Sequence, residues 1–313
     1  MTGDVATGDV ATGAEALPLS LGPDLHTRAP QWVLPKGATD THFHVFGPQD
    51  RFPFSPRRRY DAPDAPIEQW WAMAAVCGID RGVAVTGSVH GSDNAPIIDA
   101  IARSDGRLRG VAKVDADTPY SELEQMKAAG VVGARFSILS DRSGTIDEVQ
   151  RAAPVLAELG WSMDLHLSAD ALLENEAIVR GLPVPVVIDH MANLRPSDGL
   201  DHPAMQLLLD LVATGNVWVK VAAVHKRSAI HRADVAEGAT PYTDVVERAR
   251  VLVERAPDRV LWGTDYPHAN IYDPRETPNE GDLLDVLALY APDDQSRQKL
   301  LVDNPAQLYG FDV

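Results

Sequence analysis

The chain has 313 residues, 45% of them hydrophobic, and its 45 acidic and 28 basic side chains give a formal net charge of −17. The length and apolar content are those of a globular protein with a sizeable core, whereas the negative charge argues against nucleic acid or an anionic membrane as a partner. The chain has no apolar run of about 20 residues, no signal-like N-terminus and no second cysteine beside Cys77, which predicts a cytoplasmic protein without membrane spans or disulfides.

The first 37 residues differ from the rest of the chain. The pentapeptide TGDVA occupies residues 2–6 and recurs at residues 7–11. A repeat of small residues cannot bury a core, so we predict a disordered or extended N-terminal tail over residues 1–37. Residues 38–313 are then expected to form the catalytic domain.

From residue 38 onwards, short apolar segments of strand type alternate with segments of helical pattern. The predicted strands are 38–46, Arg81–Ser88, Leu108–Val114, Val131–Ser137, Trp161–Leu167, Val184–His190, Val217–Ala222 and Val260–Asp265. The predicted helices between them are Ile67–Cys77, Ile97–Arg103, Tyr120–Ala129, Ile146–Leu159, Ala171–Arg180, Ala204–Thr214 and Tyr242–Arg255. This alternation predicts parallel strands joined by helices.

Eight such units in about this length predict a single (β/α)8 TIM barrel. A doubly wound open sheet is the alternative architecture for the same alternation. No glycine-rich dinucleotide-binding turn follows any of the strands, which counts against that alternative.

Polar side chains collect at the ends of the predicted strands. Seven of the ten histidines lie at or just beyond strand ends, among them His42, His44 and His166. In a (β/α)8 barrel the carboxyl ends of the strands form the active site. Packing alone does not account for so many buried polar groups, because each one left unpaired costs roughly 2–7 kcal/mol. A metal ion and a polar substrate would supply partners.

The pair His42 and His44 is the strongest local signal. Side chains at i and i+2 of a strand point to the same face, so both imidazoles can reach one ion. Imidazole is a good ligand for zinc. A histidine pair alone is also found on ordinary surface strands, and its weight here comes from the histidines and Asp265 at the other strand ends.

Four segments resemble the amidohydrolase superfamily, and in particular its amidohydrolase-2 branch, which contains 2-pyrone-4,6-dicarboxylate lactonases, related lactonases and decarboxylases of the aminocarboxymuconate-semialdehyde type. They are DTHFH at 40–44, the histidine at 166, IDHM at 188–191 and RVLWGTDYPH at 259–268. The resemblance runs from about residue 36 to the end and includes VDNPAQLYGF at 302–311. HGSDN at 90–94 and IDHMAN at 188–193 are more similar to the lactonases.

The resemblance implies a role for each of these residues. His42, His44, His166 and Asp265 match the family's metal ligands, and His190 matches the histidine that polarises the substrate or orients water. Binuclear members carry a carbamylated lysine on the fourth strand, where this chain has Ala134-Arg135-Phe136. The expected cofactor is therefore one divalent ion, zinc or alternatively manganese.

One position departs from the pyrone-dicarboxylate lactonases. Those enzymes resemble this chain but have tyrosine at the fifth-strand position and act without metal, whereas this chain has His166. The difference favours a metal-dependent lactonase over the specific pyrone substrate. The second arginine expected shortly after Arg135 is displaced, and Arg142 is the candidate for it.

These roles predict a metal-dependent hydrolase that opens the lactone of a small anionic acid in the catabolism of aromatic compounds or sugar acids. Asp265 would accept the proton of the attacking water and pass it to the leaving oxygen, assisted by His190. Arginine offers a carboxylate a two-pronged contact, which suits an anionic substrate. The predicted substrate-binding residues are Arg135, Arg142, Arg227, His90, Ser88, Tyr60 and His268.

Three other functions fit the same residues less well. A metal-dependent decarboxylase of an aromatic or muconate-type acid would use the same ligands and release CO2. A metal-free lactonase would use the histidines only to bind and polarise its substrate. A non-enzymatic metal-binding protein would need no arginines around the site. The aromatic pair Trp70-Trp71 fits either a homo-oligomer interface or helix packing against the barrel.

Overall fold

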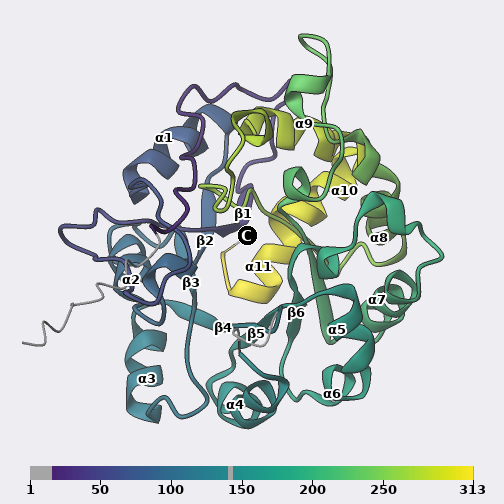
Figure 1. Cartoon of the computed structure of the whole chain (residues 1–313). Helices are drawn as coiled ribbons and strands as arrows, with labels where there is room; N and C mark the ends of the chain where they lie inside the picture. Colours follow the sequence, from purple (N-terminus) through teal and green to yellow (C-terminus); the bar gives the residue numbers. More distant parts are fainter. Residues whose placement is uncertain (1–15, 140–143, 313) are drawn as a thin grey trace, which may run out of the picture.

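The computed structural model describes residues 16–139 and 144–312, and its centre is a barrel of eight parallel strands in sequential order. Backbone pairing between Phe43 and Tyr266 joins the first strand to the chain just after the last one. Figure 1 shows the strands ringed by helices. The predicted (β/α)8 barrel is confirmed. The strands are β1 (Thr39–Phe43), β2 (Arg81–Val85), β3 (Leu108–Ala112), β4 (Val131–Ser137), β5 (Ser162–His166), β6 (Val186–Ile188), β7 (Val217–Val221) and β8 (Val260–Trp262).

The helices pack their apolar faces on the outside of the barrel. In α4, five apolar residues at helical spacing between Val149 and Leu159 are buried, and Thr145 and Glu148 form a capping box at its start. No helix within the described residues is long and apolar enough to cross a membrane. The helices are α1 (Ile67–Cys77), α2 (Ala95–Ala102), α3 (Tyr120–Ala128), α4 (Ile146–Leu159), α5 (Ala169–Glu174), α6 (Glu176–Gly181), α7 (Pro203–Ala213), α8 (Val246–Arg255), α9 (Glu280–Tyr290), α10 (Asp294–Gln298) and α11 (Asn304–Tyr309).

Several predicted boundaries are wrong, and the errors lie mainly around the site. The strands predicted to reach His190 and Asp265 end at Ile188 and Trp262, because the chain turns sharply there. The helix predicted over Ala171–Arg180 is two short helices, α5 and α6, separated at Asn175. Tertiary contacts override the local apolar pattern at such turns.

The C-terminal segment closes the barrel at the amino ends of the strands. Tyr309 and Phe311 belong to an apolar cluster with inward-facing residues of the strands, including Val187. Arg81 and Arg109, at the starts of β2 and β3, donate to backbone carbonyls of the last residues of the chain. This plug leaves the carboxyl ends of the strands as the open side.

Residues 16–37 run along the outside of the barrel without forming a helix. Arg28 contacts Asp282 and Asp285 of α9 at 2.6 and 2.5 Å, and the indole nitrogen of Trp32 donates to the Leu284 carbonyl at 2.9 Å. These contacts fix an extended segment on the domain. The repeat at 2–11 lies outside the described residues, so its predicted disorder stays a prediction.

The aromatic pair of α1 packs within the chain. Trp70 is fully buried, stacks on Phe43 with ring centroids 4.1 Å apart and donates to Asp40 at 3.2 Å. Trp71 is half-buried under the guanidinium of Arg107, 4.1 Å from its ring. Packing against the barrel therefore accounts for both tryptophans, and neither is evidence of an oligomer.

Candidate active site

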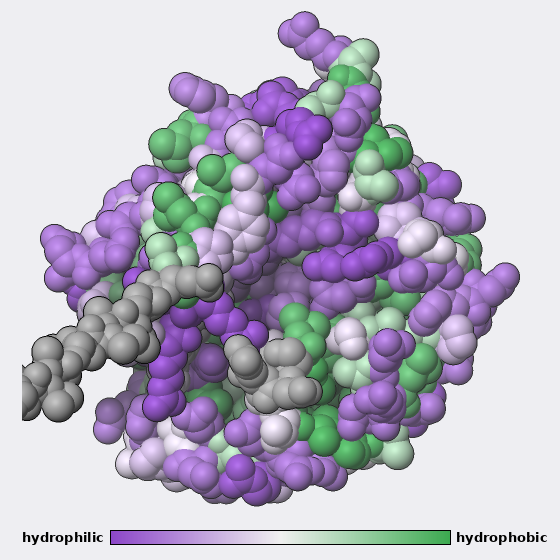
Figure 2. Space-filling view, viewed as in Figure 1, coloured by the Kyte–Doolittle hydropathy of each residue, from purple (hydrophilic) through white to green (hydrophobic). Residues whose placement is uncertain are grey.

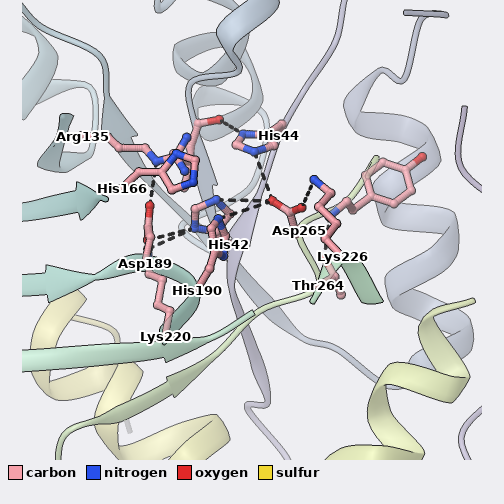
Figure 3. A network of polar contacts seen from close by, with 12 residues as sticks. His42, His44, Arg135, His166, Asp189, His190, Lys220, Lys226, Thr264 and Asp265 are labelled. Atoms are coloured by element: carbon pink, nitrogen blue, oxygen red, sulfur yellow. Dashed lines mark hydrogen bonds and ion pairs between the residues drawn. The ribbon is translucent and has the colours of Figure 1, made fainter. Parts of the chain in front are cut away.

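The first cluster of the site comes from β1 and the turn after β8. The Oδ1 atom of Asp265 lies 3.7 Å from Nε2 of His42 and 3.6 Å from Nε2 of His44. The Asp265 amide donates to the His42 carbonyl at 2.8 Å, which ties the turn to β1. Figure 3 shows the Asp265 carboxylate pointing at the two imidazoles. The structure thus brings the predicted histidine pair onto one face and places Asp265 opposite it.

The turn after β6 adds His190. Its Nε2 lies 3.9 Å from Oδ1 of Asp265. His190, Met191, Ala192 and Asn193 all have left-handed backbone angles, with φ between 52 and 55°. Each such residue other than glycine costs roughly 1–2 kcal/mol, and strain of this kind gathers at functional sites. The surrounding buried packing holds a turn that the local sequence would not adopt alone.

Candidate metal ligands gather on these elements. Within the described residues, the group of three with ligand atoms within 4.8 Å of one another is His42, His190 and Asp265, all buried. His166, at the end of β5, lies beside this group, with its ring centroid 5.1 Å from that of His190 and its Nδ1 3.5 Å from the Ser137 hydroxyl. Of the four predicted ligands, His42 and Asp265 belong to this group, and His44 lies outside it, 3.6 Å from Asp265. His190, expected to polarise the substrate, takes the third place in the group, and His166 lies outside it.

Burial sets the charge states of these side chains. It lowers the pKa of His42 to about 3 and that of His190 and His166 well below the usual value, so these imidazoles are neutral. Burial alone would raise the pKa of Asp265, but the ammonium of Lys226, 2.6 Å away, and the neighbouring histidines hold it well below its usual range. Neutral imidazoles beside an ionised carboxylate are the forms that bind a metal cation.

Hydrogen bonding fixes which nitrogen of His44 carries the proton. Nδ1 of His44 donates to the Val85 carbonyl at 2.8 Å, so in the neutral ring the Nε2 lone pair faces Asp265. Nδ1 of His42 lies 3.4 Å from the Lys220 ammonium and 3.5 Å from the Asp189 carboxylate, and its Nε2 has no hydrogen-bond partner among residues 16–139 and 144–312. The Nε2 atoms of both histidines face the same oxygen of Asp265.

A buried ion network supports the site from inside the barrel. Lys220 of β7 is fully buried, with Nζ 2.5 Å from Asp164 of β5 and 3.5 Å from Asp189. Arg135 of β4 donates to the other oxygen of Asp189 at 2.7 Å. The pKa of Asp189 stays well below its usual value because Lys220 and Arg135 outweigh the opposing effect of burial. Through Asp189 the network orients His42, as carboxylates beside metal-binding histidines do.

Sequence reasoning missed this network. The sequence pattern places Asp189, Lys220 and Asp164 within predicted strands and gives them no role. The signal was present: Lys220 stands inside the apolar run VWVKVA, where a charged residue has to be paired. Arg135 donates from its Nε to Asp189, and its side chain is 13% exposed, so its predicted contact with a substrate carboxylate stays a prediction.

Two predicted substrate-binding residues, Arg227 and His268, lie in the turns after β7 and β8. Arg227 follows β7, its buried Nε has no partner in the part of the chain that the structure describes, and burial near Arg195 lowers its pKa. Nε2 of His268 lies 3.0 Å from Glu280 at the start of α9, so only its Nδ1 is available to a ligand. Arg142 lies outside the described residues.

The remaining predicted substrate-binding residues lie in the turns beyond β1 and β2. The hydroxyls of Tyr60 and Ser88 are 3.0 Å apart, and burial raises the pKa of Tyr60 to about 12. Nε2 of His90 accepts from the Gly47 amide at 3.3 Å, and its ring packs edge-on against Phe54. His90 therefore has a structural contact on one nitrogen. The space-filling view shows a central hollow with mainly hydrophilic residues around it (Figure 2).

Comparisons with known proteins agree with this site and fold. A 4-sulfomuconolactone hydrolase of Hydrogenophaga intermedia is 38% identical over 299 residues, or 95% of this chain and 96% of that protein. A 2-pyrone-4,6-dicarboxylate hydrolase of Comamonas testosteroni is 40% identical over 283 residues, or 90% of this chain and 92% of that protein. An apo crystal structure from Agrobacterium tumefaciens is similar with a TM-score of 0.80 at 27% identity, covering 92% of this chain and 99% of that one. The family model described as amidohydrolase matches residues 39–311, and the chain belongs to the amidohydrolase family.

Proposed function

We propose that the protein is a hydrolase that opens a lactone of a small anionic acid with the help of one divalent cation. The activity class is that of its relatives, which are hydrolases named for 4-sulfomuconolactone and for 2-pyrone-4,6-dicarboxylate. The observation that carries the proposal is the approach of three imidazole Nε2 atoms, those of His42, His44 and His190, to one oxygen of Asp265.

The spacing of these atoms supports a cation between them. Ligand atoms that share a tetrahedral zinc at about 2.0–2.1 Å lie about 3.4 Å from one another. The three distances from Asp265 Oδ1 are 3.6, 3.7 and 3.9 Å, close to that edge length and too long for hydrogen bonds. The Nε2 lone pair of His44, which faces the Asp265 carboxylate, also needs a positive partner. We assign His42, His44, Asp265 and His190 as the residues that would hold the cation.

When bound, the cation supplies Lewis acidity that polarises the lactone carbonyl and makes water a stronger acid. The chain supplies the rest. The water oxygen bonds to the acyl carbon as the Asp265 carboxylate takes one of its protons, the acyl carbon–ring oxygen bond breaks, and the same carboxylate returns that proton to the ring oxygen. The new carboxylic acid releases the second proton of the water to solvent. The product gains one water and holds a carboxylate and a hydroxyl group. We propose that His166, neutral and beside His190, hydrogen-bonds the carbonyl oxygen.

The charges around the mouth support an anionic substrate. Arg227 and Lys226 follow β7, and the Arg227 guanidinium offers a two-pronged contact to a carboxylate or sulfonate. The names of the relatives describe lactones with acidic groups, a sulfonate in one and two carboxylates in the other. We propose that Arg227 binds such a group.

Assay of the purified protein against a panel of lactones tests the activity. We expect ring opening, followed by acid release, of muconolactone-type lactones that carry an acidic group, and little turnover of their neutral esters. After chelation the activity should fall by at least about tenfold and return with zinc or manganese. Release of CO2 in place of ring opening would identify a decarboxylase, and full activity in protein without metal would identify a metal-free lactonase.

The metal content of two variants discriminates the fourth ligand. The sequence assigned this role to His166, and the geometry favours His190. We expect His190→Asn to lose about 10–100-fold in zinc affinity, measured by competition with a chromogenic chelator. His166→Tyr should keep the wild-type affinity and lower kcat. The opposite ranking would restore His166 as the ligand.

A further inference from the structure

Lys226 divides the two oxygens of the Asp265 carboxylate between different partners. Its ammonium lies 2.6 Å from Oδ2, while Oδ1 faces the imidazoles of His42, His44 and His190. The Lys226 side chain is 20% exposed and that of Asp265 is 4% exposed, so solvent screens this contact only weakly. Figure 3 shows Lys226 approaching the carboxylate from the side away from the histidines.

The position of Lys226 is built into the fold. A short turn, Val224–Lys226, follows β7, and Ala223 before it has a left-handed backbone with φ of 54°. This kink lets the neighbouring His225 point into the core, fully buried, while Lys226 reaches the turn after β8. The contact therefore joins the ends of β7 and β8 across the rim of the site.

We infer that Lys226 is a positioning residue that restricts Asp265 to one-oxygen binding of the cation. This inference rests on the proposed function. A carboxylate can bind a cation through one oxygen or two. Oδ2 already accepts a charge-assisted hydrogen bond from the Lys226 ammonium. A metal cation bound to the same oxygen would lie only a few ångströms from this ammonium, and the repulsion between the two positive charges disfavours that position. A fifth position, beyond the four proposed protein ligands, then stays free for water, as catalytic sites require.

Removing the ammonium should let the carboxylate rotate and bind through both oxygens. We expect Lys226→Met to keep its cation but to lower kcat by about 10–100-fold, a typical effect of losing a residue that orients a ligand, with KM little changed. Lys226→Arg, which can also donate to Oδ2, should recover most of the activity. Lys299→Met removes a surface lysine that is likewise 2.6 Å from an aspartate, Asp258, and serves as the control with unchanged kinetics.

The visible absorption spectrum of the cobalt-substituted protein reports the coordination directly, independently of activity. We expect changed band positions and intensities in Lys226→Met relative to the wild type, because the second carboxylate oxygen takes the place of water in the ligand set, and a wild-type spectrum in Lys226→Arg. An unchanged spectrum in Lys226→Met, or a raised KM with unchanged kcat, would overturn the inference. Failure of the wild-type protein to bind cobalt would also overturn the inference about Lys226. The proposed lactone hydrolysis is tested separately, by the assay of the wild-type protein on the lactone panel.

Discussion

We expect the Asp265→Asn variant to lose lactone-opening activity by about 10²–10⁴-fold in kcat, the usual contribution of a general base. The amide keeps the shape of the side chain but cannot accept the water proton. It also removes the negative charge that faces His42, His44 and His190. Steady-state kinetics on the best lactone of the panel measure the loss, and elemental analysis shows whether the cation is lost as well.

Asp258→Asn is the matched control for this variant. Asp258 pairs with Lys299 at 2.6 Å, the same separation as between Asp265 and Lys226. Its side chain is 63% exposed, and it precedes β8, at the opposite end of the strand from the site. Its kcat should equal that of the wild type. A kcat for Asp265→Asn within about tenfold of the wild-type value would remove Asp265 as the general base, because an amide has no basic oxygen to replace it.

The second large effect is expected on stability. Lys220→Met should lower the free energy of unfolding by about 3–5 kcal/mol, because it leaves Asp164 and Asp189 without their shared cation in the barrel interior. All three side chains have no solvent exposure, and Nζ lies 2.5 and 3.5 Å from the two carboxylates. Urea unfolding followed by circular dichroism measures the change.

The surface lysine again provides the comparison. Lys299→Met removes a Lys–Asp pair that is 28% and 63% exposed, so it should cost at most about 1 kcal/mol. Equal losses in the free energy of unfolding for the two variants would show that the interior ion pairs of Lys220 stabilise the fold no more than a surface pair does. A double variant, Lys220→Met with Asp164→Asn, should recover part of the stability, because it removes the carboxylate of Asp164, whereas Asp189 keeps its pair with Arg135.

The sequence located the site because a barrel has simple periodicity. Alternation along β1 puts His42 and His44 on one face, and the order of eight similar units brings Asp265 beside them. The activity class that the family resemblance implies is confirmed by relatives named as hydrolases of lactones. The metal ligand set and substrate remain predictions, which the variants above test.

What the sequence determined by itself was the architecture, the end of the barrel that carries the chemistry, and the residue types at its centre. All three follow from local patterns of apolar and polar residues. Only the tertiary structure decided how charges pair across the barrel. Lys220, Asp164 and Asp189 come from three different strands or turns, and Lys226 meets Asp265 across the rim. Such pairing depends on left-handed turns and strand register, which long-range packing stabilises against local preference.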